Sequence, residues 1–275
     1  MSEDVGGAVR LVVSDVDGTL VDHDKQLHAA TTEAVGRLRR AGIAFTIISA
    51  RPMSGMLPIA EALDINAPMA AFNGGTIFRR DGSVIARHVI DPAVVRAMFD
   101  LARGLPLNRW LFADGLWHAD DKDNSYVARE RIASDQEPLI VSDFEYLFGR
   151  TDKLTFISDD HGLLDELQSR ASELKARATI AKSQPYYLDV TALEANKGDG
   201  IARLTEAMDV PLLATAAIGD QANDIPMLTR AGLSIAMAQG PQAVRDAANF
   251  VTASNEADGV ALAIDEMILP TLTRN

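Results

Sequence analysis

The sequence predicts an α/β protein with an open, doubly wound parallel sheet of the Rossmann-like kind and an inserted α+β domain. Short β-branched apolar runs alternate with helical segments at both ends of the chain, the pattern of parallel strands covered by helices on both faces. Between them, hairpin signals are mixed with helices, which indicates a different arrangement. We therefore place a core domain at residues 1–80 and 191–275, and an inserted cap domain at 81–190.

The first part of the core domain alternates strands with helices. Each predicted strand is a short apolar run, and the first helix carries apolar residues spaced for one face, with Gly42 as its stop. The predicted elements are a strand at 11–13, a helix at 29–40, a strand at 43–48, a helix before residue 68 and a strand at 68–72. Buried strands of this kind deliver the polar residues that follow them to the edge of the sheet.

The rhythm changes after about residue 80 and returns near residue 197. The inserted part is expected to contain a hairpin turn at 79–82, a helix near 92–103, paired strands within 107–118, a strand at 153–158, a helix at 162–177, and strands at 179–182 and 186–190. A helix from Lys197 to about residue 208 then precedes a strand at 212–218, which ends in Gly219 and Asp220.

Composition limits the class of partner. Formal net charge is −13 with the acidic residues spread along the chain, so the surface should repel nucleic acid and anionic membranes. There is no cysteine, which excludes disulfides and thiolate metal sites. Residues 1–7 lack a signal-peptide pattern, and no apolar run approaches the roughly 20 residues that cross a bilayer. We expect a cytoplasmic protein with a small-molecule substrate; its oligomeric state is left open.

Acidic residues follow two of the predicted strands, where ligands bind in open α/β sheets. Asp15 and Asp17 can direct one carboxylate and one backbone carbonyl to the same point, and Asp220 adds a third oxygen ligand. Hard oxygen ligands are those that Mg²⁺ prefers. An Asp-Gly pair alone would be an ordinary turn, but two acidic clusters after two strands favour a metal site. His23 and His28 lack metal-ligand spacing with another histidine, so surface or capping roles are expected.

Four motifs resemble those of one enzyme superfamily. Asp15-Val16-Asp17-Gly18-Thr19-Leu20 resembles the first motif of the haloacid dehalogenase superfamily, Ser49 the second, Lys197 the third, and Gly219-Asp220-Gln221-Ala222-Asn223-Asp224 the fourth. Their order and separations match as well. The chain is similar to the Cof-type phosphatases, whose large C2-type cap lies between the second and third motifs. The resemblance covers nearly the whole chain.

The resemblance implies a magnesium-dependent phosphatase acting on a small phosphorylated metabolite, such as a sugar phosphate. Asp15 would attack phosphorus to form an aspartyl-phosphate, and Asp17 would act as general acid and then as general base. The implied metal ligands are Asp15, Asp17, Asp220 and Asp224, and the implied phosphate-binding residues are Ser49, Lys197, Gly18 and Asn223. Ser49 would donate a hydrogen bond to phosphate, and Lys197 would neutralise developing charge.

Some residues keep two interpretations. Arg51 could bind phosphate or pair with an acidic neighbour, and Asn73 and Gly74 could face the substrate or form a simple turn. Two departures from the family pattern have no assigned consequence. Ala50 stands where glycine is usual, and Gln239-Gly240 lies in a stretch that usually carries Asn-Ala.

Two other functions compete with the phosphatase. A phosphomutase would form the same aspartyl-phosphate but would yield an isomer with almost no inorganic phosphate. A non-catalytic binding module is disfavoured because the nucleophile, the acid/base and the metal carboxylates are all present.

Overall fold

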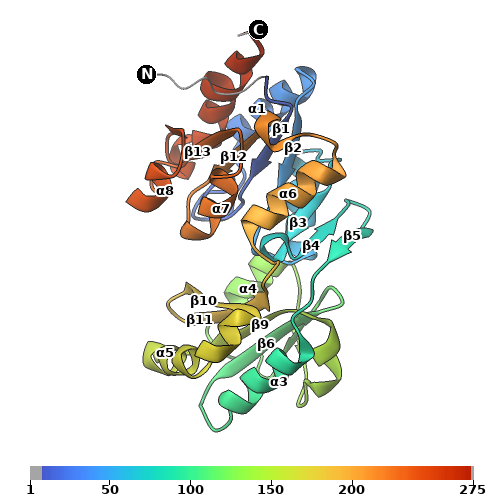
Figure 1. Ribbon diagram of the computed structural model, residues 1–275, viewed down its shortest axis with the longest axis vertical. Helices are drawn as coiled ribbons and strands as arrows, with labels where there is room; N and C mark the ends of the chain where they lie inside the picture. The colour runs from blue at the N-terminus through green and yellow to red at the C-terminus, as the bar shows by residue number, and fades with distance from the viewer. Residues whose placement is uncertain (1–7, 274–275) are drawn as a thin grey trace. The chain divides into compact units, whose positions relative to one another are not determined.

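The computed structural model describes residues 8–273, and the chain divides into two compact units (Figure 1). Unit 1 comprises the chain up to Ala50, Met56–Ile85 and the chain from Asn196 onward. Unit 2 comprises Arg51–Gly55 and Ala86–Ala195. The main divisions fall at residues 85 and 195, where the sequence suggested 80 and 190. No helix in residues 8–273 is long and apolar enough to cross a membrane.

Unit 1 is built on a five-stranded parallel sheet, which confirms the predicted α/β class. Its strands are β1 (Leu11–Ser14), β2 (Ala44–Ile47), β12 (Thr215–Gly219), β13 (Leu233–Ala236) and β14 (Phe250–Val251). Their order is β14-β13-β12-β1-β2, and four of them lie side by side with labels in Figure 1. Residue Leu11 pairs with Thr215 on one side and Ala44 on the other, so β1 is an interior strand between β12 and β2. Because the strands are parallel, their carboxyl ends share one edge.

Of the helices associated with this sheet, the two whose bounds were predicted, at 29–40 and from 197 to about 208, begin and end close to those positions. The helices are α1 (Ala29–Arg40), α2 (Met53–Ala62), α6 (Lys197–Ala207), α7 (Ile225–Leu228), α8 (Gln242–Asp246) and α9 (Gly259–Leu262). Helix α1 has the predicted bounds because one face is apolar: it buries Thr31, Ala34, Val35 and Leu38. Gly42, at φ +76°, follows its C-terminus in the left-handed conformation that favours glycine.

The strand predicted at 68–72 does not continue the parallel sheet. It is β3 (Met69–Ala71), which pairs antiparallel with β4 (Thr76–Phe78), and β5 (Val84–Arg87) completes a three-stranded sheet. A parallel bridge between Ile48 and Ala70 links β3 to the end of β2. The chain reverses because Phe72, Asn73 and Gly74 all have positive φ, which ends the strand after three residues.

Two further boundaries differ from prediction. The helix expected to reach residue 177 ends as α5 (His161–Arg170), and the tighter 3₁₀ turn Ser172–Ala176 follows it. The strand expected from residue 212 begins three residues later. There, the Ala214 N–H and the Thr215 hydroxyl both donate to the Pro211 carbonyl, at 2.9 and 3.0 Å, so the preceding apolar residues form a turn.

Unit 2 contains a six-stranded sheet in the order β10-β11-β9-β6-β7-β8. The strands are β6 (Asn108–Ala113), β7 (Leu116–Ala119), β8 (Leu139–Ile140), β9 (Thr151–Ile157), β10 (Ala178–Gln184) and β11 (Tyr187–Ala192). Helices α3 (Pro92–Leu101) and α5 pack on one face, where buried side chains such as Val94, Leu154 and Leu164 form one cluster. Helix α4 (Val127–Ser134) was not predicted, because its sequence has little apolar periodicity.

His28 links three segments of unit 1 at the start of α1. It occupies the N-cap position, but its side chain does not cap the helix, contrary to the capping role considered above. Its ring instead bridges two carboxylates, with Nδ1 2.8 Å from Asp258 Oδ1 and Nε2 3.1 Å from Asp22 Oδ2. The hydrogen bonds with Asp258 and Asp22 raise the pKa of His28 above its ordinary value.

This bridge predicts a pH-dependent contribution to stability. Because the pKa is raised in the folded state, the contribution is fully present below the unfolded pKa of about 6.5 and is lost as pH rises through the folded pKa. The difference in unfolding free energy between wild type and His28→Gln should therefore shrink from about pH 6 upward. Urea unfolding at several pH values measures it, and a difference that does not vary with pH would contradict the bridge. Asp258→Asn removes one of the two carboxylates of the bridge, so the pH dependence that His28 gives to the unfolding free energy should also become smaller in this variant.

A second prediction concerns the reversal after β3. A Cβ on Gly74 would lie 2.6 Å from the Gly200 Cα, and φ is +97° there, so Gly74→Ala combines backbone strain with a backbone clash. We expect a loss of about 2–4 kcal/mol in unfolding free energy. Gly82 is the matched control, because its φ is +83° and nothing lies within 4 Å of its Cβ position. Gly82→Ala should lose only about 1 kcal/mol, and equal losses for the two variants would refute the close approach.

Candidate active site

The site begins where β1 ends. Asp15 is buried, and its N–H donates to the Ile218 carbonyl of β12 at 2.9 Å, which continues the strand pairing by one residue. The chain then turns tightly, because the N–H groups of Leu20 and Val21 both donate to the Val16 carbonyl. Gly18 has φ +84°, and a Cβ there would lie 2.6 Å from Asp220 Oδ2, so only glycine fits this turn.

A cluster of carboxylates lies at the same edge of the sheet. Carboxylate oxygens of Asp15, Asp220 and Asp224 lie within 4.8 Å of one another, and no other acidic or histidine group within residues 8–273 has this arrangement. Asp224 Oδ2 accepts from the N–H groups of Asp220 and Gln221, both at 2.8 Å. Asp220 accepts from the Thr19 hydroxyl at 3.1 Å and from Gln221 Nε2 at 3.0 Å. These contacts fix the carboxylates before any ligand binds.

Lys197 supplies the positive charge of the cluster. It is the first residue of α6, whose N-cap residue Asn196 accepts from the Asp199 N–H at 2.9 Å. Its side chain is 1% exposed, and Nζ donates to Asp15 Oδ1 and to Asp224 Oδ1. The helix start thus places one ammonium group between two carboxylates from different elements.

The cluster contains three carboxyl groups but only one ammonium group, so its charges are not balanced. Burial raises the pKa of Asp15 well above its ordinary value, and Asp224 and Asp220 add to this effect while Lys197 opposes it. Burial and Asp224 likewise raise the pKa of Asp220. Burial alone would lower the pKa of Lys197, but the two carboxylates raise it above its ordinary range. Three buried carboxylates around one ammonium group therefore fit a hard divalent cation, in both donor chemistry and charge.

Hydrogen bonds within unit 1 connect three further residues of the predicted site, Ser49, Asn73 and Asn223. Ser49 is buried, its N–H donates to the Ala70 carbonyl, and its own carbonyl accepts from the Asn73 N–H at 2.7 Å. Asn223 Nδ2 donates to Asn73 Oδ1 at 3.3 Å. Gly74 lies close to the start of α6, because a Cβ on it would be 3.0 Å from the Asn196 carbonyl oxygen, and this contact leaves both of its interpretations open.

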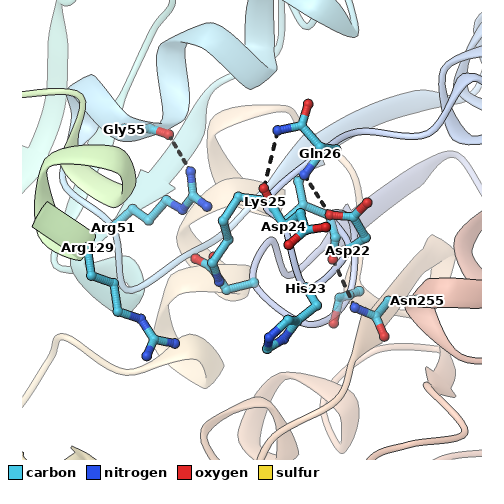
Figure 2. A network of polar contacts seen from close by, with 12 residues as sticks. Asp22, His23, Asp24, Lys25, Gln26, Arg51, Gly55, Arg129 and Asn255 are labelled. Carbon is cyan, nitrogen blue, oxygen red and sulfur yellow. Dashed lines mark hydrogen bonds and ion pairs between the residues drawn. The ribbon is translucent and has the colours of Figure 1, made fainter.

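Asp17 and Arg51 have other partners. The Asp17 carboxylate accepts from Lys25 Nζ at 2.7 Å and is 34% exposed, so it is not a member of the buried carboxylate cluster. Arg51 belongs to unit 2, and its Nη1 donates to the Gly55 carbonyl at 3.1 Å (Figure 2). That contact decides neither of its two interpretations.

Sequence reasoning missed two residues that contact the first motif. Lys25 pairs with Asp17, and no motif marks it. Gln239 donates from Nε2 to the Gly18 carbonyl at 2.5 Å and accepts from the Asn255 N–H at 3.3 Å. The departure from the family pattern at Gln239-Gly240 was visible in the sequence, and the structure gives it a role: Gln239 ties the first motif to the segment after β14.

Comparisons with known proteins agree with this geometry. The family model of the haloacid dehalogenase-like hydrolases matches residues 12–264. A Haemophilus influenzae protein provisionally named a phosphatase is 30% identical over 259 residues, which cover 94% of this chain and 97% of the relative. A Bacillus subtilis 5-amino-6-(5-phospho-D-ribitylamino)uracil phosphatase is 26% identical over 262 residues, covering 95% and 96%.

Solved structures give the same result for the fold. A haloacid dehalogenase-like hydrolase from Bacteroides thetaiotaomicron aligns with a TM-score of 0.87 and 26% identity, covering 94% of this chain and 99% of the other. The matches extend over nearly the whole chain, and the residues matched by the family model include all four motifs. The chain belongs to the haloacid dehalogenase-like hydrolases, and within them it is a phosphatase of the Cof type.

Proposed function

We propose that the protein is a magnesium-dependent phosphomonoester hydrolase that acts through an aspartyl-phosphate on Asp15. The observation that carries this proposal is the environment of Asp15. Its carboxylate lies just after the interior strand β1, contacts the Lys197 ammonium group, and shares with Asp220 and Asp224 a cluster whose carboxylate oxygens lie within 4.8 Å of one another. A nucleophile that must meet a phosphate dianion needs this combination of fixed position and nearby positive charge.

The metal would be held by the carboxylates of Asp15, Asp220 and Asp224 and by the backbone carbonyl of Asp17. Bound there, Mg²⁺ would offset the repulsion between the anionic nucleophile and the anionic phosphate. The hydrogen bonds from Thr19 and from backbone N–H groups hold Asp220 and Asp224, so little rearrangement of these ligands is needed.

The chain's own residues account for both chemical steps. A carboxylate oxygen of Asp15 attacks phosphorus, the bond from phosphorus to the leaving oxygen breaks, and Asp17 gives that oxygen its proton. Asp17 then takes a proton from water as the water oxygen attacks phosphorus. The bond from phosphorus to Asp15 breaks, which releases inorganic phosphate and restores the carboxylate.

Phosphate binding is proposed for residues around the nucleophile. The Ser49 hydroxyl and the Lys197 ammonium group would donate to phosphoryl oxygens, and Gly18 and Asn223 would add contacts. Burial of Lys197 supports its part, because an ammonium group in a water-poor site interacts strongly with developing charge. We also propose that three further residues face the substrate: Arg51, Asn73 and Gly74.

The substrate class follows from the insertion and from the relatives. We propose that residues 81–190 form the cap domain and select the organic part of the substrate. The named Bacillus relative acts on a phosphorylated ribityl compound, so sugar phosphates and related metabolites are the first class to test. Net charge −13 disfavours nucleic acid and anionic membrane surfaces, and the absence of cysteine fits the cytoplasm.

Phosphate release from a panel of phosphorylated metabolites tests the proposal. Wild type should release inorganic phosphate with Mg²⁺ and not with EDTA, and Asp15→Asn should reduce turnover by more than about 10³-fold because the nucleophile is lost. Intact-mass measurement after rapid acid quenching should show one added phosphoryl group on wild type only. Isomer formation without phosphate release would identify a mutase, and unchanged activity in Asp15→Asn would refute the nucleophile.

Metal binding should also appear as stability, independent of turnover. At Mg²⁺ concentrations about 100 times the dissociation constant, linkage predicts a gain of about 2.7 kcal/mol in unfolding free energy. Asp220→Asn should lose most of this gain, because one buried ligand charge is removed. Asp209→Asn removes the same charge at an exposed position and should keep the gain. A Mg²⁺ effect that Asp220→Asn leaves intact would place the metal elsewhere.

A further inference from the structure

We propose that Lys25 is a positioning residue that holds the Asp17 carboxyl group in the place from which it gives a proton to the leaving oxygen and, once ionised, takes one from water. Lys25 Nζ lies 2.7 Å from Asp17 Oδ1, and the two side chains are 28% and 34% exposed. The proposal rests on the function given above, because it assumes that Asp17 exchanges protons with the leaving group and with water. No motif includes Lys25, which lies eight residues beyond Asp17 in the loop before α1.

The loop that carries Lys25 is closed by its own hydrogen bonds (Figure 2). The Asp22 N–H donates to the Gln26 carbonyl at 3.0 Å, and Asp22 Oδ1 accepts from the Gln26 N–H at 2.7 Å. The Lys25 N–H donates to the Asp22 carbonyl at 3.1 Å. Lys25 itself has φ +63°, a conformation that side-chain-bearing residues seldom adopt. The loop therefore holds Lys25 in an unfavourable backbone conformation, and that conformation accompanies its contact with Asp17.

The segment after β14 fixes this loop from outside. The His23 N–H donates to Glu256 Oε1 at 2.8 Å, and Asn255 Nδ2 donates to the Val21 carbonyl at 3.1 Å. His28 adds the bridge to Asp258 described above. These contacts join residues more than 200 positions apart, so tertiary structure adds to the loop's own hydrogen bonds in setting the position of Lys25.

An ion pair this exposed adds little to stability, because water screens it and two side chains lose freedom. The effect of this ion pair on the position of the Asp17 side chain is larger than its effect on stability. Asp17 lies two residues from Asp15, which belongs to a buried carboxylate cluster, and like charge in that cluster repels the Asp17 carboxylate. The Lys25 ammonium group draws the Asp17 carboxyl group toward the loop before α1, at a distance of 2.7 Å. A general acid must lie within hydrogen-bond reach of the leaving oxygen, and displacement of about 1 Å can cost about 10²-fold in rate.

The test compares leaving groups, since only a poor leaving group needs the proton. For an alkyl phosphate such as a sugar phosphate, Lys25→Met should lower kcat/KM by about 10- to 100-fold. For p-nitrophenyl phosphate, whose leaving group departs as a stable anion, the loss should be less than about threefold. Lys25→Arg should restore most of the alkyl phosphate activity. A general loss of structure would lower both rates alike, so the ratio separates positioning from folding.

Matched variants complete the design. Lys175→Met makes the same charge change at an exposed position of unit 2 and should leave both rates near wild type. Lys25→Gly removes the ammonium group but relieves the positive φ, so it should fold and show the same ratio as Lys25→Met. Thermal unfolding of each variant confirms that the folded protein is being measured.

The outcomes separate this inference from the proposed function. If Asp17→Asn shows the leaving-group dependence and the Lys25 variants do not, the inference alone is overturned. If Asp17→Asn lacks that dependence while Asp15→Asn is inactive, the role of Asp17 fails and the role of Lys25 fails with it. Equal losses on both substrates in Lys25→Gly would also overturn the proposal.

Discussion

The contact of one buried ammonium group with two buried carboxylates governs the rest of the site. Lys197, from the start of α6, lies between Asp15 at the end of β1 and Asp224 beyond β12. Burying charge is unfavourable unless each group is paired and hydrogen-bonded, and here the third carboxylate, Asp220, leaves negative charge in excess. The excess negative charge in this cluster lowers the stability of the ligand-free protein, but it is complementary to a bound cation and, through that cation and Lys197, to a phosphate. Function and stability are therefore opposed at this point of the fold.

The parallel sheet brings this cluster together. Asp15 and Asp220 are 205 positions apart in the chain, yet each follows a strand, and these two strands are neighbours in register. Backbone pairing thus fixes the distance between the carboxylates before their side chains are considered. The close approach of Gly18 to Asp220 completes this geometry, because a side chain at that position would displace the carboxylate.

Helices and strands with a regular apolar pattern could be predicted from the sequence. Local structure that depends on a single contact between distant residues could not. The bounds of α1 follow from its apolar spacing, and the motif residues follow from the strands that precede them. The reversal at Gly74 depends on its packing against Gly200, which no local pattern reveals. Lys25 and Gln239 were missed for the same reason, since each meets the first motif through a loop whose path is set elsewhere.

Asp15 and Asp17, the two aspartates of the first motif, are held in place by different kinds of contact. Asp15 is fixed by buried charge and by strand pairing, which tolerate little change. Asp17 depends on a partly exposed network in which Lys25 and Gln239 belong to segments far apart in the chain. Each contact of that network is individually weak, but together they determine one loop conformation. Because the Asp15 and Asp17 side chains are held by separate means, substitutions in the loop can change the surroundings of Asp17 while the buried carboxylate cluster stays as it is. Gln239, which departs from the family pattern, contributes to the support of this loop through its contact with the Gly18 carbonyl.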